Sequence, residues 1–294
     1  MSAVEGAAPR AHPLEYASEA LGLGLFMVSA CSFALLLFHP ASPIAHALPG
    51  EPARRALMGL AMGVTLVLNV YSPWGRRSGA HLNPAVTLAF WRLGRVRAAD
   101  LAGYALAQLT GGVLGVALVA WVAGPVLAHP SVRYVVTQPG PAGAGVAFAA
   151  ELVISFVLLS AVLRVMASRH AARTAWVAAV LLASYIALES PLSGTSMNPA
   201  RTLGSALIAH DYRALWVYLL APPLGFLLAA ELWRAEVRAR RMRDSACAKL
   251  LHHPADDCIF CGQRGERGRG ARHEAERAGT SAGGSAFTTG RRSA

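Results

Sequence analysis

The chain has 294 residues, of which 54% are hydrophobic and only 15% are charged. A soluble domain has about a quarter of its residues charged, so this composition excludes an ordinary soluble protein and predicts a lipid bilayer as partner. The formal net charge of +11 does not indicate a nucleic-acid partner, because the basic residues lie in short loops between apolar runs and in the C-terminal tail.

Six apolar runs follow one another along the chain. The first three have no charged side chain and are near or above the ~20 residues that a membrane-spanning helix needs. The first run is long enough to stay in the membrane as a span, so we expect no cleavable signal. We therefore predict an all-α membrane protein with six transmembrane helices. The runs are 21–38, 56–74, 101–128, 142–163, 174–188 and 214–230.

The distribution of arginine predicts the orientation of these spans. Arginines gather at 76–97, at 164–173 and in the C-terminal tail, and loops rich in basic residues usually face the cytoplasm. We expect both termini to be cytoplasmic. Lys249 is the only lysine among 27 Lys and Arg residues, a bias that indicates a GC-rich bacterial genome and hence a bacterial plasma (inner) membrane.

The tripeptide Asn-Pro-Ala occurs twice, each time before a stretch too short to cross a membrane. The surrounding segments 79–88 and 194–203 share Gly, Asn, Pro, Ala, Thr and Leu at matching positions. Each half of the chain thus has three spans with a half-length segment after its second. Because three is odd, the second half should be inverted, and paired short segments of this kind indicate a conduction or binding site. The six residues are Asn83, Pro84, Ala85, Asn198, Pro199 and Ala200.

The chemistry of Asn-Pro predicts a short helix at each place. Asn is a preferred N-cap and Pro is preferred at the first helical position, so a helix should begin after Asn83 and after Asn198. Two such helices meeting head to head would bring two positive ends together, which repels protons and cations. The non-helical backbone before each Asn would offer carbonyl groups to a polar neutral molecule. These pore-loop residues are Gly79, Ala80, His81, Gly194 and Ser196.

Segments 78–87 and 194–201 resemble the two signature loops of the aquaporin (major intrinsic protein) family, and the likeness extends over about 15–233. The resemblance implies an aquaporin-like fold of six transmembrane helices plus two re-entrant half-helices. It also implies a homotetramer with one pore per subunit, and a passive channel rather than an enzyme. The predicted organisation is an N-terminal segment (1–14), a channel domain (15–235, with halves at about 15–125 and 145–235) and a basic tail (236–294).

Two acids stand alone inside apolar helices, Glu19 and Glu151, near the start of each half. By the resemblance they match acids that brace the re-entrant loops through hydrogen bonds. An intramembrane acid can instead belong to a proton relay. We favour the brace, because the repeat relates the two acids and neither has an obvious relay partner.

The resemblance also implies a selectivity filter of four residues. Arg201 and Thr195 match the family pattern, whereas the span-five position aligns with Ile186 rather than the usual His. The span-two position aligns with Met62, or with Gly63 if the following loop has no extra residue. Such a filter is more apolar than that of a strict water pore. We expect water as the main permeant, with glycerol, hydrogen peroxide and ammonia as further uncharged candidates.

His81 lies two residues before the first Asn, and either a titrating gate or a hydrogen-bonded packing role fits that position. The expected functions are a water channel, a broader facilitator of small neutral solutes, or a gated or structural membrane tetramer with little flux. An ion-coupled transporter is disfavoured, because no ionisable site beyond the two bracing acids is evident.

The basic tail contains a cluster of thiols and imidazoles whose spacing is typical of zinc ligands. We predict no cofactor in the pore and a possible structural zinc in this knuckle, at 247–261. Unliganded reduced thiols beside a lipid-attracted segment are the alternative. Beyond Gly262 we expect disorder. The candidate ligands are Cys247, His252, His253, Cys258 and Cys261.

Overall fold

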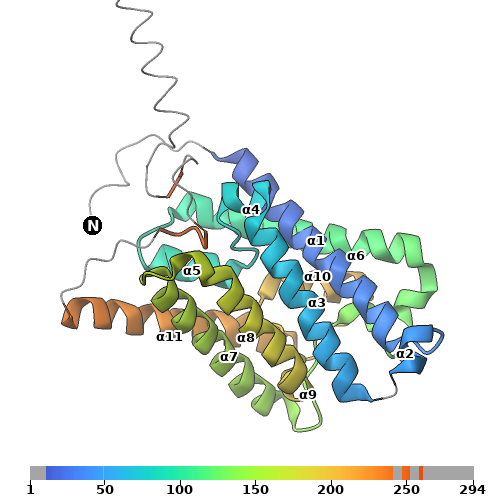
Figure 1. Cartoon of the computed structure of the whole chain (residues 1–294). Coiled ribbons are helices and arrows are strands. Elements are labelled where there is room, and N and C mark those ends of the chain that lie inside the picture. Colours follow the sequence, from blue (N-terminus) through green and yellow to red (C-terminus); the bar gives the residue numbers. More distant parts are fainter. Residues whose placement is uncertain (1–10, 49, 241–246, 252–257, 261–294) are drawn as a thin grey trace, which may run out of the picture.

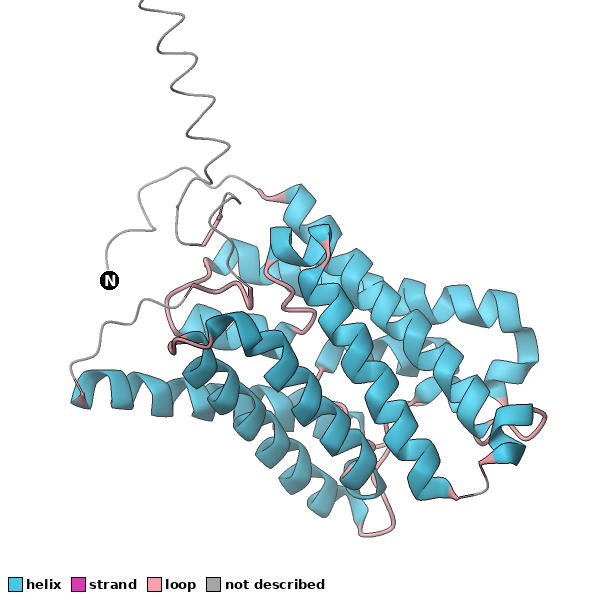
Figure 2. Cartoon of the chain, in the orientation of Figure 1, coloured by secondary structure: helices cyan, strands magenta, loops and turns pink. Residues whose placement is uncertain are grey.

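The computed structural model describes residues 11–48, 50–240, 247–251 and 258–260 (Figure 1). Within these ranges the chain forms helices and loops and no strand (Figure 2). Six of the described helices are long and apolar enough to span a membrane, which confirms the predicted fold class. They are α1 (Pro13–Phe38), α3 (Glu51–Tyr71), α6 (Ala98–Ala123, continued by η1, Gly124–Ala128), α7 (Gly143–Met166), α8 (Thr174–Leu188, together with the preceding η3, Ala171–Arg173) and α11 (Leu215–Ala239).

Several of these helices are longer than the apolar runs that predicted them. α1 begins at Pro13, so its first turns include Glu15 and Glu19, and α11 continues to Ala239 through charged residues. α3 is displaced toward the N-terminus and ends at Tyr71, because Ser72 caps a separate short helix that begins with Pro73. Apolar runs mark the part of a helix that lies in hydrocarbon, not the position at which its hydrogen bonding ends.

The repeat predicts three spans and one half-length segment in each half; the structure has these four helices in the same order in both halves, with a further short helix before each half-length segment. In the first half α1 and α3 lead to α4 (Pro73–Ser78), α5 (Pro84–Arg92) and α6. In the second half α7 and α8 lead to α9 (Ser190–Ser193), α10 (Pro199–Ala209) and α11. The first half also contains the short helix α2 (Pro43–Ala47), and η2 (Arg133–Val135) and η3 (Ala171–Arg173) lie in connections.

Glycines allow the long helices to pack closely in pairs. A Cβ atom on Gly111 of α6 would lie 2.0 Å from the carbonyl oxygen of Ala20 on α1, and one on Gly59 of α3 would lie 2.4 Å from that of Ala183 on α8. No side chain fits at either crossing, so the two backbones come into contact there, as small residues at helix crossings in membranes allow. In the second half α7 and α11 pair as α1 and α6 do, since a Cβ atom on Gly225 would lie 2.4 Å from the carbonyl oxygen of Leu152, whereas α3 and α8 pair across the two halves.

Candidate functional site

The two half-helices begin at the capping side chains that the sequence predicts. The Oδ1 atom of Asn83 accepts a hydrogen bond from the amide of Ala85 (2.9 Å), and that of Asn198 accepts bonds from the amides of Ala200 (3.0 Å) and Arg201 (3.2 Å). Each cap satisfies amide groups that a helix end otherwise leaves without partners.

The same two side chains tie the half-helices to each other. Asn83 Nδ2 donates to the carbonyl of Met197 (2.7 Å), and Asn198 Nδ2 donates to the carbonyl of Leu82 (2.7 Å). The helix N-termini therefore meet across the molecule. An Asn amide has two N–H groups, so each keeps one further donor beyond the one that crosses to the opposite loop.

The four residues before each Asn have an unusual backbone that is repeated in both halves. Gly79, Ala80 and Leu82 have positive φ, and so do Gly194, Thr195 and Met197 at the matching positions. A positive φ is costly for residues other than Gly, so surrounding contacts must hold these loops in shape. The loops are non-helical, as predicted, and their carbonyl groups have no helical partners.

Glu19 of α1 holds the first loop. Its carboxylate accepts hydrogen bonds from the amides of His81 (3.0 Å) and Leu82 (2.6 Å) and from Nε2 of Gln108 (2.7 Å). Glu19 is fully buried, so these three donors compensate the desolvation of the carboxylate.

Glu151 of α7 holds the second loop in the same way. Its carboxylate accepts bonds from the amides of Ser196 (2.6 Å) and Met197 (2.7 Å) and from the hydroxyl of Ser193 (2.8 Å). Both acids thus bind amides of the loop in their own half. Among the hydrogen bonds of the described residues, neither acid contacts another ionisable group to which it could pass a proton.

Two cavities adjoin the second loop and the start of α10. The first, here called the central cavity, has a volume of about 110 Å³ and is lined by both capping residues, by loop residues including His81, and by apolar side chains. The second, here called the wide cavity, has a volume of about 430 Å³. Both are lined by Phe26, Leu182, Ser196 and Arg201, so the two cavities meet at the first turn of α10.

The four predicted filter residues lie together on the wall of the wide cavity: Met62, Ile186, Thr195 and Arg201. Gly63 does not line either cavity, because its Cα faces α8, where an added Cβ would lie 3.0 Å from the carbonyl oxygen of Ala179. Of the two alternatives in span two, Met62 is therefore the one that faces the cavity. Met62 comes from α3, Ile186 from α8, Thr195 from the second loop and Arg201 from α10, and the first and last of them are 139 positions apart in the sequence (201 − 62).

Two polar residues beside this wall were not predicted. The Arg201 guanidinium donates a hydrogen bond to the hydroxyl of Thr137, and the Thr195 hydroxyl donates to a carboxylate oxygen of Glu189 (2.6 Å). In the sequence Glu189 reads only as a charge that ends a span, and Thr137 lies in a loop without a motif. No sequence signal was available for either contact.

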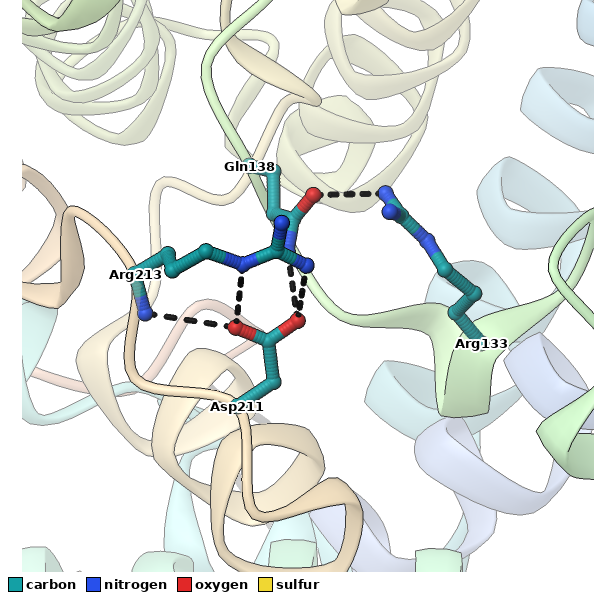
Figure 3. Close-up of polar contacts among 4 residues, drawn as sticks. All are labelled: Arg133, Gln138, Asp211 and Arg213. Atoms are coloured by element: carbon teal, nitrogen blue, oxygen red, sulfur yellow. Dashed lines mark hydrogen bonds and ion pairs between the residues drawn. The ribbon is translucent and has the colours of Figure 1, made fainter.

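Arg133 and Gln138 form part of the rim of the wide cavity, and a chain of polar contacts leads from them to Asp211 and Arg213 (Figure 3). Arg133 donates to Gln138 (2.6 Å), and Gln138 donates to Asp211 (2.6 Å), whose carboxylate also accepts two bonds from the Arg213 side chain. The hydrogen bonds from Arg213 hold the pKa of Asp211 below its usual value. The bond from Gln138 to Asp211 joins the loop after α6 to the loop after α10.

His81 is buried beside the central cavity with both ring nitrogens partnered. Nδ1 lies 3.1 Å from the Thr87 hydroxyl, and Nε2 lies 2.8 Å from the carbonyl oxygen of Ala248. A carbonyl oxygen has no proton to give, so Nε2 carries the hydrogen in this contact. The ring also stacks on Phe90 at 5.0 Å. These contacts fit the hydrogen-bonded packing role.

Part of the predicted zinc knuckle lies among the described residues. The Sγ atoms of Cys247 and Cys258 are 3.3 Å apart. His252, His253 and Cys261 lie outside the described residues, and so does the segment after Gly262. No group of three or more potential ligands gathers within the described ranges.

Comparison with known proteins agrees with this architecture. Residues 12–233 match the family described as major intrinsic protein. Glycerol uptake facilitator protein-like 6 of Lactiplantibacillus plantarum is 36% identical over 178 residues, which are 59% of this chain and 81% of that protein. Aquaporin NIP3-1 of Zea mays is 37% identical over 213 residues, 69% of this chain and 67% of that protein.

A solved structure shares the fold. The X-ray structure of the aquaglyceroporin from Plasmodium falciparum has a TM-score of 0.62 and 20% identity, covering 76% of this chain and 96% of that one. At this identity the likeness concerns the fold alone. Together with the family match over 12–233, the twin half-helices and the six apolar helices lead to one conclusion: the chain belongs to the major intrinsic protein family, whose members are passive membrane channels for water and small solutes and not enzymes.

Proposed function

We propose that this channel conducts water together with small uncharged solutes of about the size of glycerol, and that it excludes protons and ions. The observation that carries the proposal is the convergence of Met62, Ile186, Thr195 and Arg201 on one cavity, which meets the central cavity at Arg201. In this proposal the two cavities form one pathway, and the four side chains form its filter.

The chemistry of the filter favours neutral solutes over strict selection of water. Met62 and Ile186 offer no hydrogen-bond donor, so one side of the wall can accept the carbon skeleton of a polyol. Arg201 and the loop carbonyls can bind hydroxyl groups on the other side. The relative named as a glycerol uptake facilitator also favours this breadth.

Exclusion of ions follows in this proposal from two sources of positive potential. Asn83 and Asn198 cap helices whose positive ends meet at the central cavity, and Arg201 adds a full charge where the cavities join. A cation or proton on this path would meet repulsion in a medium of low dielectric constant, where it is poorly screened. Glu19 and Glu151 brace the loops that hold these groups.

The assembly and orientation are also proposed. We infer a homotetramer in a bacterial inner membrane with both termini cytoplasmic, so that the wide cavity opens outside the cell. The outer faces of the long helices carry exposed apolar side chains such as Leu106 and Trp121 on α6, which can meet lipid or a second copy. Chemical cross-linking in native membranes tests the number of subunits.

We expect Ile186→His to lower the ratio of glycerol to water permeability by about tenfold. The imidazole ring narrows the cavity at the filter and replaces apolar surface with a hydrogen-bond donor. The measurement is stopped-flow light scattering on proteoliposomes, and the ratio does not depend on how many channels are open. Leu188→His, an exposed position two residues further along α8, is the matched control and should leave the ratio unchanged. An unchanged ratio in Ile186→His would remove Ile186 from the filter.

We also propose a structural zinc in the tail. Cys247 and Cys258 have sulfurs 3.3 Å apart, near the ~3.8 Å expected of two thiolates on one tetrahedral zinc with Zn–S bonds of ~2.3 Å. We expect about one zinc per chain by inductively coupled plasma mass spectrometry, lost in Cys258→Ser and kept in Cys31→Ser. Protein purified without chelators that contains no zinc would refute this site.

A further inference from the structure

The described part of the tail, residues 247–251 and 258–260, lies against the channel near α4 and α5 (Figure 1). We call these residues the tail segment, and we call the adjoining end of the central cavity, beside Gly79 and His81, the tail-side mouth. The tail segment is more than 160 residues from the first loop in sequence (Ala248 to His81 is 167). Its position there requires specific contacts.

Two hydrogen bonds join the tail segment to the first pore loop. The amide of Leu250 donates to the carbonyl of Gly79 (3.2 Å), and Nε2 of His81 donates to the carbonyl of Ala248 (2.8 Å). These partners are a pore-loop carbonyl and a pore-loop side chain. The tail segment therefore occupies polar groups that we assigned to the path of the permeant.

Aromatic and apolar side chains complete the contact. Phe260 stacks on His81 with ring centroids 5.6 Å apart and meets Tyr104 edge-on at 6.0 Å. Leu250 lines the central cavity together with Asn83 and His81. Gly79 leaves room for the segment, because a Cβ atom there would lie 3.1 Å from Lys249 Cα.

The low exposure of three tail-segment residues shows that this part of the tail packs into the apolar core of the channel rather than lying on its surface. Ala248 is fully buried, Lys249 is 2% exposed and Leu250 is 8% exposed. Ala248 and Leu250 belong to the same apolar cluster as Phe226 of α11 and Leu159 of α7. A lysine is rarely buried to this extent, so the segment must be held in one place.

From these contacts we propose that the tail segment is an autoinhibitory plug that closes the tail-side mouth of the pore. The inference rests on the proposed channel function. The contact uses one hydrogen bond between backbone groups, one from the His81 side chain, and two large apolar side chains, and in this proposal docked and undocked states exchange. Cys247 and Cys258, with sulfurs 3.3 Å apart, join the two parts of the plug into one unit.

The test removes the apolar side chains of the plug in the full-length chain. In Leu250→Ala/Phe260→Ala the docked state loses most of its apolar contact, so we expect water and glycerol permeability to rise together by about tenfold. Phe287→Ala is the matched control, since it deletes an aromatic ring of the same tail outside the described residues. Stopped-flow light scattering on proteoliposomes measures both solutes, and Leu250→Ala alone should give a smaller rise.

Lys249, the only lysine in the chain, allows docking to be measured separately from flux. An endoproteinase specific for lysine can cut only after Lys249, releasing the last 45 residues (294 − 249). In detergent micelles, where both faces are accessible, we expect slow cutting of the wild type and of Phe287→Ala. Cutting of Leu250→Ala/Phe260→Ala should be at least about tenfold faster, because the undocked state is populated.

Two results would overturn the plug. Cutting of the wild type as fast as of the double variant means that the segment does not dock, whatever the channel conducts. Faster cutting of the variant with unchanged fluxes means that docking does not close the pore. Failure of the proposed function is recognised differently: wild type and double variant both pass no more water or glycerol than protein-free liposomes, whereas failure of the plug alone requires fluxes that are well above that background and equal in the two proteins.

Discussion

Glu151→Ala is expected to abolish most water permeability and to lower thermal stability, the largest effect among the single substitutions considered. The change leaves the amides of Ser196 and Met197 and the hydroxyl of Ser193 buried without their acceptor. Each unsatisfied group costs about 1–3 kcal/mol, so the second loop should abandon its positive-φ conformation. Stopped-flow flux and the midpoint of thermal unfolding in detergent measure the two effects.

Two further variants distinguish the loss of the Glu151 hydrogen-bond acceptors from the loss of a negative charge. Glu151→Gln keeps one oxygen acceptor but brings an NH₂ group toward an amide, so it should retain part of the flux. Glu236→Ala removes a partly exposed acid whose ion pair with Arg164 lies away from the pore, and it should behave as the wild type. Normal flux in Glu151→Ala would show that the loop keeps its shape without the carboxylate.

Arg201→Ala is expected to raise glycerol permeability by about tenfold and to make the channel measurably permeable to protons. The side chain lines both cavities where they meet, so its loss widens the path at that point. It also removes a full positive charge, which in surroundings of low dielectric constant is a substantial barrier to cations. Proton flux is followed with a pH-sensitive dye trapped in the vesicles.

Arg213→Ala is the matched control for charge, because Arg213 lies near the rim in contact with Asp211 but lines neither cavity. It should change neither the glycerol-to-water ratio nor proton flux. If Arg201→Ala kept the wild-type ratio and remained tight to protons, Arg201 would not be part of the filter.

Local chemistry explains why the half-helices could be predicted. The cap at Asn83 is formed within two residues, from its own Oδ1 to the amide of Ala85, and Pro84 starts the helix by its own ring geometry. The same pattern at Asn198 allowed the internal repeat to be recognised in the sequence. The ends of the long helices were less accurate, as α1 and α11 continue past their apolar runs into charged residues.

Contacts between distant segments could not be predicted. The bond from Thr195 to Glu189 and the bond from Arg201 to Thr137 depend on how α8 and the loop after η2 pack around α10. Whether Met62 or Gly63 faces the cavity likewise depends on how α3 is rotated against α8, because a shift of one residue would exchange the two positions. No motif marks these residues.

The sequence by itself determined the membrane-spanning class, the inverted repeat, the two capped half-helices and the pair of lone acids, because these follow from composition, periodicity and bonds within a few residues. Only the tertiary structure decided that the two caps bind each other's loops, that Met62 faces the cavity, and that the tail segment lies on His81 and Gly79. Those contacts join residues up to 167 positions apart, and their formation depends on the packing of whole helices.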